Sequence, residues 1–243
     1  MRGKVRQSRA FLVDLDGTLI SNRQTLPGAH DLLARLGDRF VVVSNNAEDT
    51  PAQLARQLEL TGLLVPAERL VLAGTTALEM IAQEPAKTHT GRRVMLLGSF
   101  ELRRYGLGLG LDMTEHDPDV VLVARDRDFS YARLEAAANA IRKGARLVVA
   151  NPDLVHPGPE SSVVPETGAL LAAILACTGP VPYEIVGKPE PTLFLRALSL
   201  LGARAEDSVM VGDNLRTDGA GARRLGMQFM AVQAGRRLAA LSV

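Results

Sequence analysis

Cysteine is nearly absent from this 243-residue sequence, in which Cys177 is the single example. One cysteine excludes an intramolecular disulfide, and a chain without disulfides suits a reducing compartment. The N-terminal stretch is basic, but its apolar run stops at Asp14 and is too short for the hydrophobic region of a signal peptide. We therefore expect a cytoplasmic protein, and we expect Cys177 to lie in the core because it belongs to a continuously apolar helix.

A strong net charge and long apolar runs are also lacking. The formal net charge is +1, so the chain does not have the basic field that nucleic-acid or anionic-lipid binders use. The most apolar segment, Ala169–Cys177, is far shorter than the roughly 20 residues needed to cross a bilayer. We expect neither a nucleic acid nor a membrane as a partner, and a homodimer is left open.

The sequence does contain a regular alternation of short β-branched runs and longer amphipathic segments. This alternation is typical of parallel strands joined by crossover helices and predicts an α/β protein. The predicted strands cover 10–15, 39–44, 69–73, 93–97, 119–124, 146–150, 183–186, 207–211 and 227–232, and the predicted helices cover 28–36, 51–60, 75–83, 131–143, 168–176, 191–201 and 217–225. The repeat Gly106–Leu111 lacks the context of a dinucleotide-binding motif and is predicted to be a turn. Periodicity alone also allows a (β/α)₈ barrel.

The run FLVDLDGTL combines a buried strand with two acids. Three apolar residues lead into Asp14, then Asp16, and Gly17 permits a sharp exit from the strand. Ligands bind at the carboxyl ends of strands in open α/β sheets, so this position favours a functional site. An ordinary Asp-Gly turn is the alternative explanation.

The run VMVGDNLRTD repeats this arrangement near the C-terminus. Another apolar strand ends at Gly212, and Asp213, Asn214 and Asp218 follow it. If the two strands are neighbours, several carboxylates meet at one sheet edge and repel one another unless a cation is present. A few hard oxygen ligands suit Mg²⁺ better than Zn²⁺, which favours histidine or cysteine ligands. Taken singly, these residues could instead cap the following helix.

Two further strand ends carry groups that can bind phosphate. Lys188 follows a strand and Gly187, and its ammonium would offset surplus carboxylate charge. The run VVVSNNA ends a strand with Ser44 and Asn45, which offer hydroxyl, amide and backbone donors to phosphate oxygens or cap the next helix.

With these four motifs in place, the chain resembles the haloacid dehalogenase-like (HAD) phosphohydrolase superfamily. It is most similar to the subfamily with a class IIA cap, which includes NagD-type, p-nitrophenylphosphatase and pyridoxal phosphate phosphatase-like proteins. The strings DLDGT, GDNLRTD, GKP and NPD carry the resemblance. It implies a Rossmann-like parallel-sheet core formed by residues 1–73 and 183–243, with an α/β cap domain inserted at 74–182, and not a barrel.

The resemblance also implies a role for each residue of the motifs. Asp14 would attack phosphorus and form an aspartyl-phosphate, while Asp16 would serve as general acid and then as general base. The carboxylates of Asp14 and Asp213 and the carbonyl of Asp16 would bind Mg²⁺. Asp218 would hold Lys188 or a metal-bound water. Asn214, like Asp218, would contact the residues that bind the metal and the phosphate, and not the ligands themselves.

Substrate choice is expected to reside in the cap, where Asn151, Asp153 and His156 are candidate substrate contacts. Low aromatic content, with no Trp, three Tyr and six Phe, favours a small aliphatic phosphate monoester over a base or pyridine ring. The expected partner is therefore a small phosphorylated metabolite. Two alternatives remain: a haloacid dehalogenase, in which Asp16 would be idle, and a catalytically silent phospholigand-binding protein of the same fold.

Overall fold

The computed structural model describes residues 10–84, 92–158, 160 and 162–232. These residues form two compact units, each with its own open five-stranded sheet. The core unit contains the described residues of 1–44, 51–71 and 188–243, and the inserted unit contains 45–50 and the described residues of 72–187. The α/β prediction is confirmed, and the barrel alternative is wrong because neither sheet closes on itself. In the described part of the chain, no helix is both long and apolar enough to span a membrane.

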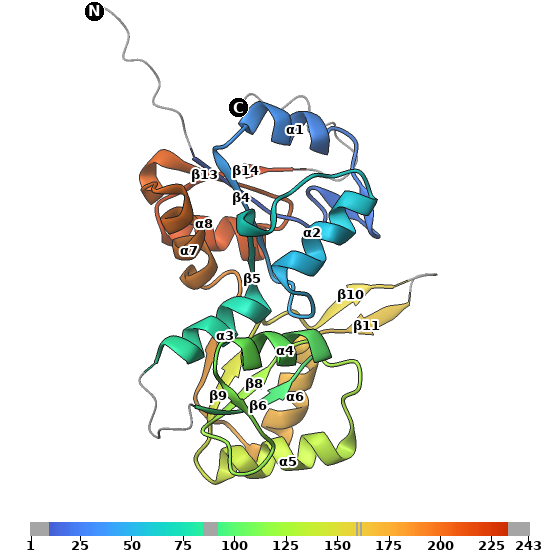
Figure 1. The fold of residues 1–243 in the computed structure, drawn as a ribbon, viewed down its shortest axis with the longest axis vertical. Coiled ribbons are helices and arrows are strands. Elements are labelled where there is room, and N and C mark those ends of the chain that lie inside the picture. The colour runs from blue at the N-terminus through green and yellow to red at the C-terminus, as the bar shows by residue number, and fades with distance from the viewer. Residues whose placement is uncertain (1–9, 85–91, 159, 161, 233–243) are drawn as a thin grey trace, which may run out of the picture. The chain divides into compact units, whose positions relative to one another are not determined.

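The core unit is built on a sheet with the strand order β14-β13-β1-β4-β5 (Figure 1). Its strands are β1 (Ala10–Val13), β4 (Phe40–Ser44), β5 (Leu70–Leu72), β13 (Ser208–Gly212) and β14 (Gln228–Ala231). β1 lies between β13 and β4, pairs with both in parallel, and is buried along its whole length because all four residues are apolar. Val13 is in register with Val211 on one side and Val42 on the other. The carboxyl ends of these three strands therefore lie side by side, where α/β sheets bind ligands.

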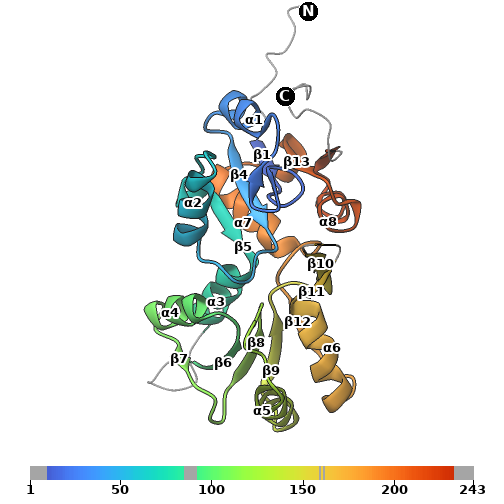
Figure 2. The ribbon, with the colours of Figure 1, turned by 90° about the vertical axis from the view of Figure 1, so that its right-hand side faces the viewer.

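Helices cover both faces of the core sheet, with α7 and α8 on one side and α1 and α2 on the other (Figures 1 and 2). The helices are α1 (Ala29–Leu36), α2 (Pro51–Leu60), α7 (Pro191–Leu201) and α8 (Ala220–Arg224), with short turns η1 (Ala67–Arg69), η3 (Ala205–Asp207) and η4 (Leu215–Gly219). Pro51 and Pro191 occupy first turns, and Gly202 ends α7 in the left-handed conformation. A hairpin of β2 (Ile20–Ser21) and β3 (Gln24–Thr25) was not predicted from sequence; both turn residues, Asn22 and Arg23, have positive φ.

The inserted unit has a parallel sheet with the order β12-β9-β8-β6-β7. Its elements are α3 (Ala73–Gln83), β6 (Arg93–Leu97), α4 (Phe100–Gly108), β7 (Asp112–Met113), β8 (Val120–Val123), α5 (Tyr131–Arg142), β9 (Arg146–Val149), β10 (Val155–Pro157), β11 (Val163–Pro165), α6 (Thr167–Thr178) and β12 (Tyr183–Ile185). Figure 2 shows α3 and α4 on one side of this sheet and α5 and α6 on the other. Apolar residues of α5 and α6 pack with β6, β8 and β9 into one buried cluster that includes Ile141, Val121 and Ile174.

The prediction of a turn at Gly106–Leu111 is wrong for its first half. Gly106 to Gly108 form the last turn of α4, and the chain leaves the helix only after Leu109, through Gly110 with φ +81°. Gly106 is buried, and a Cβ there would lie 2.9 Å from the sulfur of Met113. The glycine is therefore explained by close packing of the helix against β7.

The prediction that Cys177 lies in the core is also wrong, because its side chain is exposed. α6 buries the face that carries Gly168, Leu171 and Ile174, which repeats at helical spacing. Cys177 continues this three-residue spacing but lies in the last turn of the helix, where its side chain is exposed. Since the helix is apolar all round, its residue pattern does not indicate which face is buried.

Candidate functional site

Asp14 extends the β1–β13 ladder by one residue and brings a carboxylate into the interior. Its backbone N–H donates to the carbonyl of Val211 at 2.8 Å, and the residue is 5% exposed. The hydroxyl of Thr18 donates to Asp14 Oδ2 at 3.0 Å. Thr18, which is fully buried, is not among the predicted site residues. The sequence does offer one signal for this contact: Thr18 follows Asp14 by four residues, in the turn that begins at Gly17.

Lys188 is the central cation of this site. Its Nζ donates to Asp14 Oδ1 at 2.6 Å and to the carbonyl of Val43 at 3.1 Å, and it forms an ion pair with Asp218 Oδ1 at 2.7 Å. The residue is 3% exposed. Burial alone lowers the pKa of a lysine, but the two carboxylates outweigh burial and raise the pKa of Lys188 above its ordinary value. The ammonium therefore stays charged and holds both carboxylates in place.

Two glycines allow the remaining acids to approach. A Cβ on Gly17, whose φ is +81°, would lie 2.0 Å from Asp213 Oδ2, and a Cβ on Gly212 would lie 2.2 Å from Asp218 Oδ2. Asp218 belongs to η4, a π-helical turn in which the N–H of Gly219 donates to the carbonyl of Asn214 at 3.2 Å. The sequence predicted an ordinary helix over 217–225. The wider turn starts two residues earlier, and such turns occur often at functional sites.

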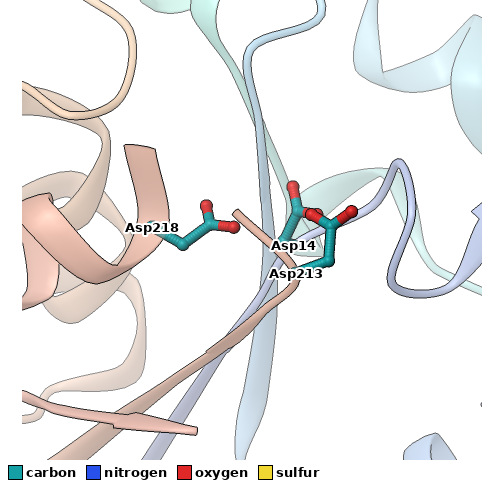
Figure 3. Close-up of side chains that lie close together, drawn as sticks. All are labelled: Asp14, Asp213 and Asp218. Atoms are coloured by element: carbon teal, nitrogen blue, oxygen red, sulfur yellow. The ribbon is translucent and has the colours of Figure 1, made fainter. Parts of the chain in front are cut away.

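Ligand oxygens of Asp14, Asp213 and Asp218 lie within 4.8 Å of one another. Figure 3 shows the Asp14 and Asp213 carboxylates next to each other and that of Asp218 directed toward them from η4. Burial, followed by the charge of Asp14, raises the pKa of Asp213. Burial also raises the pKa of Asp218 to about 6, against the opposing attraction of Lys188. The cluster carries more negative charge than one lysine offsets, and its donor set of hard oxygens fits Mg²⁺ or Ca²⁺.

The other predicted site residues of the core unit lie at the end of β4, in the loop after β1 and at the start of η4. Ser44 is the last residue of β4 and is buried, whereas Asp16 is exposed in the loop that follows β1. Asn214 is exposed and caps η4: its side chain accepts from the N–H of Arg216 at 2.9 Å. Its own N–H donates to Asp218 Oδ2 at 3.3 Å. Asn214 therefore helps to hold the carboxylate that pairs with Lys188.

The predicted residues of the inserted unit form a second group. The Asn45 amide donates to Asp153 Oδ2 at 2.9 Å, and the buried Asn151 amide donates to the Asn45 carbonyl at 2.7 Å. His156 is half-buried on β10, and its Nδ1 lies 2.6 Å from Glu166 Oε1. No sequence pattern indicates that Asn45 pairs with Asp153, because the two residues are 108 positions apart.

Similarity to proteins of known activity extends over most of the chain. The family model of haloacid dehalogenase-like hydrolases matches residues 8–226. Among the relatives is the dihydroxyacetone phosphatase of Corynebacterium glutamicum, which is 34% identical over 229 residues, covering 93% of this chain and 81% of that protein. The acid sugar phosphatase of Staphylococcus saprophyticus is 30% identical over 218 residues, covering 88% of this chain and 82% of that one.

A solved structure shows the same similarity at the level of the fold. NagD from Escherichia coli K-12 superposes with a TM-score of 0.84 at 28% sequence identity, covering 94% of this chain and 88% of that one. The resemblance inferred from the motifs is thus confirmed by the family match, the relatives and the fold together. This chain belongs to the haloacid dehalogenase-like hydrolase family.

Proposed function

We propose that this protein is a Mg²⁺-dependent phosphatase that hydrolyses small phosphate monoesters through an aspartyl-phosphate on Asp14. The observation that best supports this proposal is the setting of Asp14, whose two carboxylate oxygens accept from Lys188 and Thr18. Hydrolysis of phosphate monoesters requires accelerations of up to ~10²¹-fold, whereas one general base supplies only ~10²- to 10⁴-fold. Covalent catalysis combined with neutralisation of charge accounts for the difference.

The proposed reaction has two displacements. An oxygen of the Asp14 carboxylate attacks phosphorus, the ester P–O bond breaks, and Asp16 gives its proton to the departing alkoxide. Asp16, now ionised, takes a proton from the water that attacks phosphorus in the second step. The bond from phosphorus to Asp14 then breaks, and inorganic phosphate leaves. Lys188 offsets the negative charge of the phosphoryl oxygens in both steps.

The metal and the remaining donors complete the proposed site. Asp14, Asp213 and the carbonyl of Asp16 would hold Mg²⁺, which supplies electrostatic stabilisation of the transferring phosphoryl group. Ser44 and Asn45 would donate hydrogen bonds to its oxygens. A glycerol phosphate phosphatase of Mycobacterium tuberculosis, 31% identical with a TM-score of 0.84, has been solved in complex with magnesium and also with calcium, which supports a divalent ion at this site.

The inserted unit is proposed to act as the cap that selects the substrate, with His156 as a candidate contact. Relatives named for dihydroxyacetone phosphate, sugar phosphate and glycerol phosphate hydrolysis support a small aliphatic phosphate. A panel of glycerol phosphate, sugar phosphates, pyridoxal phosphate and nucleoside monophosphates, assayed for free phosphate with Mg²⁺, tests this class. Turnover of the aromatic esters alone would contradict it, and no turnover of any ester, nitrophenyl phosphate included, would favour the silent binding protein.

Asp16→Asn is expected to affect poor leaving groups far more than good ones. The alkoxide of glycerol needs a proton as it departs, whereas nitrophenolate hardly does. We expect kcat/KM for glycerol phosphate to fall by roughly 10²- to 10⁴-fold and that for nitrophenyl phosphate to fall much less. Because kcat/KM reports the first irreversible step, the second displacement does not mask the difference. Equal losses on both esters would count against an acid role for Asp16 and reopen the dehalogenase alternative.

Gly17→Ala is expected to displace Asp213 and to weaken Mg²⁺ activation. The added Cβ would lie 2.0 Å from Asp213 Oδ2, at a φ of +81°. Gly110 has the same φ of +81°, but a Cβ added there would meet nothing within 4 Å, so Gly110→Ala controls for backbone strain alone. We expect the Mg²⁺ concentration for half-maximal activity to rise at least tenfold in Gly17→Ala and to stay unchanged in Gly110→Ala. A tenfold rise corresponds to a loss of only ~1.4 kcal/mol of Mg²⁺ binding free energy, which a displaced ligand readily causes. Equal behaviour of the two variants would refute the assignment of Asp213.

A further inference from the structure

The segment 45–48, which belongs to the inserted unit, is bound to the rest of that unit through four consecutive backbone carbonyls. The carbonyl oxygens of residues 45 to 48 accept, in order, from Asn151 Nδ2 at 2.7 Å, Gly74 N at 3.1 Å, Arg125 N at 3.1 Å and Ser99 Oγ at 2.6 Å. Ser99, Arg125 and Asn151 lie just beyond the carboxyl ends of β6, β8 and β9. The sheet of the inserted unit therefore fixes the backbone of this segment at several points.

The side chain of Asn45 is fixed as well. Its amide nitrogen donates to Asp153 Oδ2 at 2.9 Å. Its Oδ1 lies close to Gly187, in space that a side chain at position 187 would occupy. A Cβ on Gly187 would be 2.6 Å from that oxygen. The hydrogen bond to Asp153 and the close approach of Oδ1 to Gly187 together restrict the orientation of the amide.

Asp153 is in turn held by its own loop. Its N–H donates to Asn151 Oδ1 at 3.0 Å, and its carbonyl accepts from the N–H of Gly168 at 2.8 Å. Asn151 is 2% exposed, so its amide bridges the Asn45 backbone and the Asp153 backbone from a buried position. Asn151 and Asp153 thus act on Asn45 together: Asn151 binds the backbone carbonyl of Asn45, and Asp153 binds the side-chain amide of Asn45.

We propose that Asn151 and Asp153 are positioning residues that orient the Asn45 amide for phosphate binding, an inference that rests on the phosphate-binding role proposed above for Asn45. An amide nitrogen carries two hydrogens. A charge-assisted hydrogen bond from one of them to the Asp153 carboxylate restrains the orientation of the whole amide group. Asp153 would then act on every substrate alike, through the shared phosphoryl group, and not by contact with the group that distinguishes one ester from another.

Asp153→Ala is expected to weaken phosphate binding uniformly. We expect KM for nitrophenyl phosphate, KM for glycerol phosphate and Ki for inorganic phosphate each to rise roughly tenfold, the size expected for a hydrogen bond to a charged group. Asp153→Asn retains an acceptor oxygen and is expected to restore all three constants to within about threefold of the wild-type values. Asp128→Ala, which removes an exposed acid from the same unit, is the matched control and should leave them unchanged.

A double-mutant cycle with Asn45→Ala separates positioning from direct contact. If Asp153 acts through Asn45, adding Asp153→Ala to Asn45→Ala should change KM and Ki by less than about twofold. Multiplying losses, or a Ki for phosphate that stays unchanged while KM shifts differently for each ester, would overturn the proposal and assign Asp153 to direct substrate contact. Circular dichroism and thermal melts establish that each variant is folded.

The same variants distinguish this inference from the proposed function. If the wild-type protein hydrolyses no ester, the proposed function fails, and calorimetric titration of inorganic phosphate into wild type, Asp153→Ala and Asp153→Asn still measures the positioning effect. If the wild-type protein is active but the cycle is additive, the positioning role fails and the phosphatase assignment stands.

Discussion

Asp14→Asn is expected to lower kcat by about 10⁴-fold or more, the scale seen when a nucleophile is removed. An amide oxygen is a poor nucleophile toward phosphorus and cannot form the acyl phosphate. The change is nearly isosteric, and the amide can still accept from Lys188 and contact Thr18, so the fold should be kept. The measurement is steady-state release of nitrophenolate and of phosphate with Mg²⁺, together with a thermal melt.

Asp38→Asn is the control for this variant. Asp38 is in the core unit, and its side chain is 98% exposed. Replacing this carboxylate by an amide should leave turnover unchanged. Binding of inorganic phosphate with Mg²⁺ should be nearly retained in Asp14→Asn. Turnover by Asp14→Asn at more than a few per cent of the wild-type rate would contradict the assignment of Asp14 as nucleophile.

Lys188→Met is expected to impair both stability and catalysis. The substitution leaves Asp14 and Asp218 buried without the ammonium that lies 2.6 and 2.7 Å from them. Removing one partner of a buried ion pair costs about 3–5 kcal/mol, and removing a donor from a developing charge costs roughly 10²- to 10³-fold in kcat. Urea unfolding and steady-state kinetics measure the two effects.

Mg²⁺ and a second lysine provide the controls for Lys188→Met. A divalent cation is expected to recover part of the lost stability, because it neutralises the same carboxylates, and urea unfolding with and without MgCl₂ measures this recovery. Lys143→Met removes an exposed lysine and should change neither stability nor turnover. If Lys188→Met unfolded at the same urea concentration as wild type, the central ion pair would contribute nothing and our description of the site would be wrong.

Much of the core unit follows from residues that are adjacent in sequence. Apolar runs that end in Asp14 and Asp213 predict strands whose carboxyl ends carry acids, and parallel pairing brings such ends together. The structure pairs these strands in register. Lys188 was predicted by the same reasoning, because it follows a strand and a glycine. The sequence alone therefore predicts that a cation lies among these carboxylates, because their charges would otherwise repel one another.

The features that sequence did not predict depend on side-chain packing that local propensity does not encode. The π turn at η4 depends on the close approach of Asp218 to Gly212, which no local propensity encodes. The helical end at Gly106 depends on Met113, and the exposure of Cys177 depends on which face of an apolar helix packs. Local periodicity contains no signal for such contacts, because propensity is overridden by tertiary packing.

The stereochemical course at phosphorus is the decisive measurement for a covalent intermediate on Asp14. A phosphate ester made chiral with three oxygen isotopes is turned over with Mg²⁺ in the presence of an acceptor alcohol, and the configuration of the phosphoryl group transferred to that alcohol is determined. Two successive in-line displacements, the first by Asp14, predict net retention of configuration. Net inversion would show a single displacement without a covalent intermediate and would contradict the nucleophilic role of Asp14.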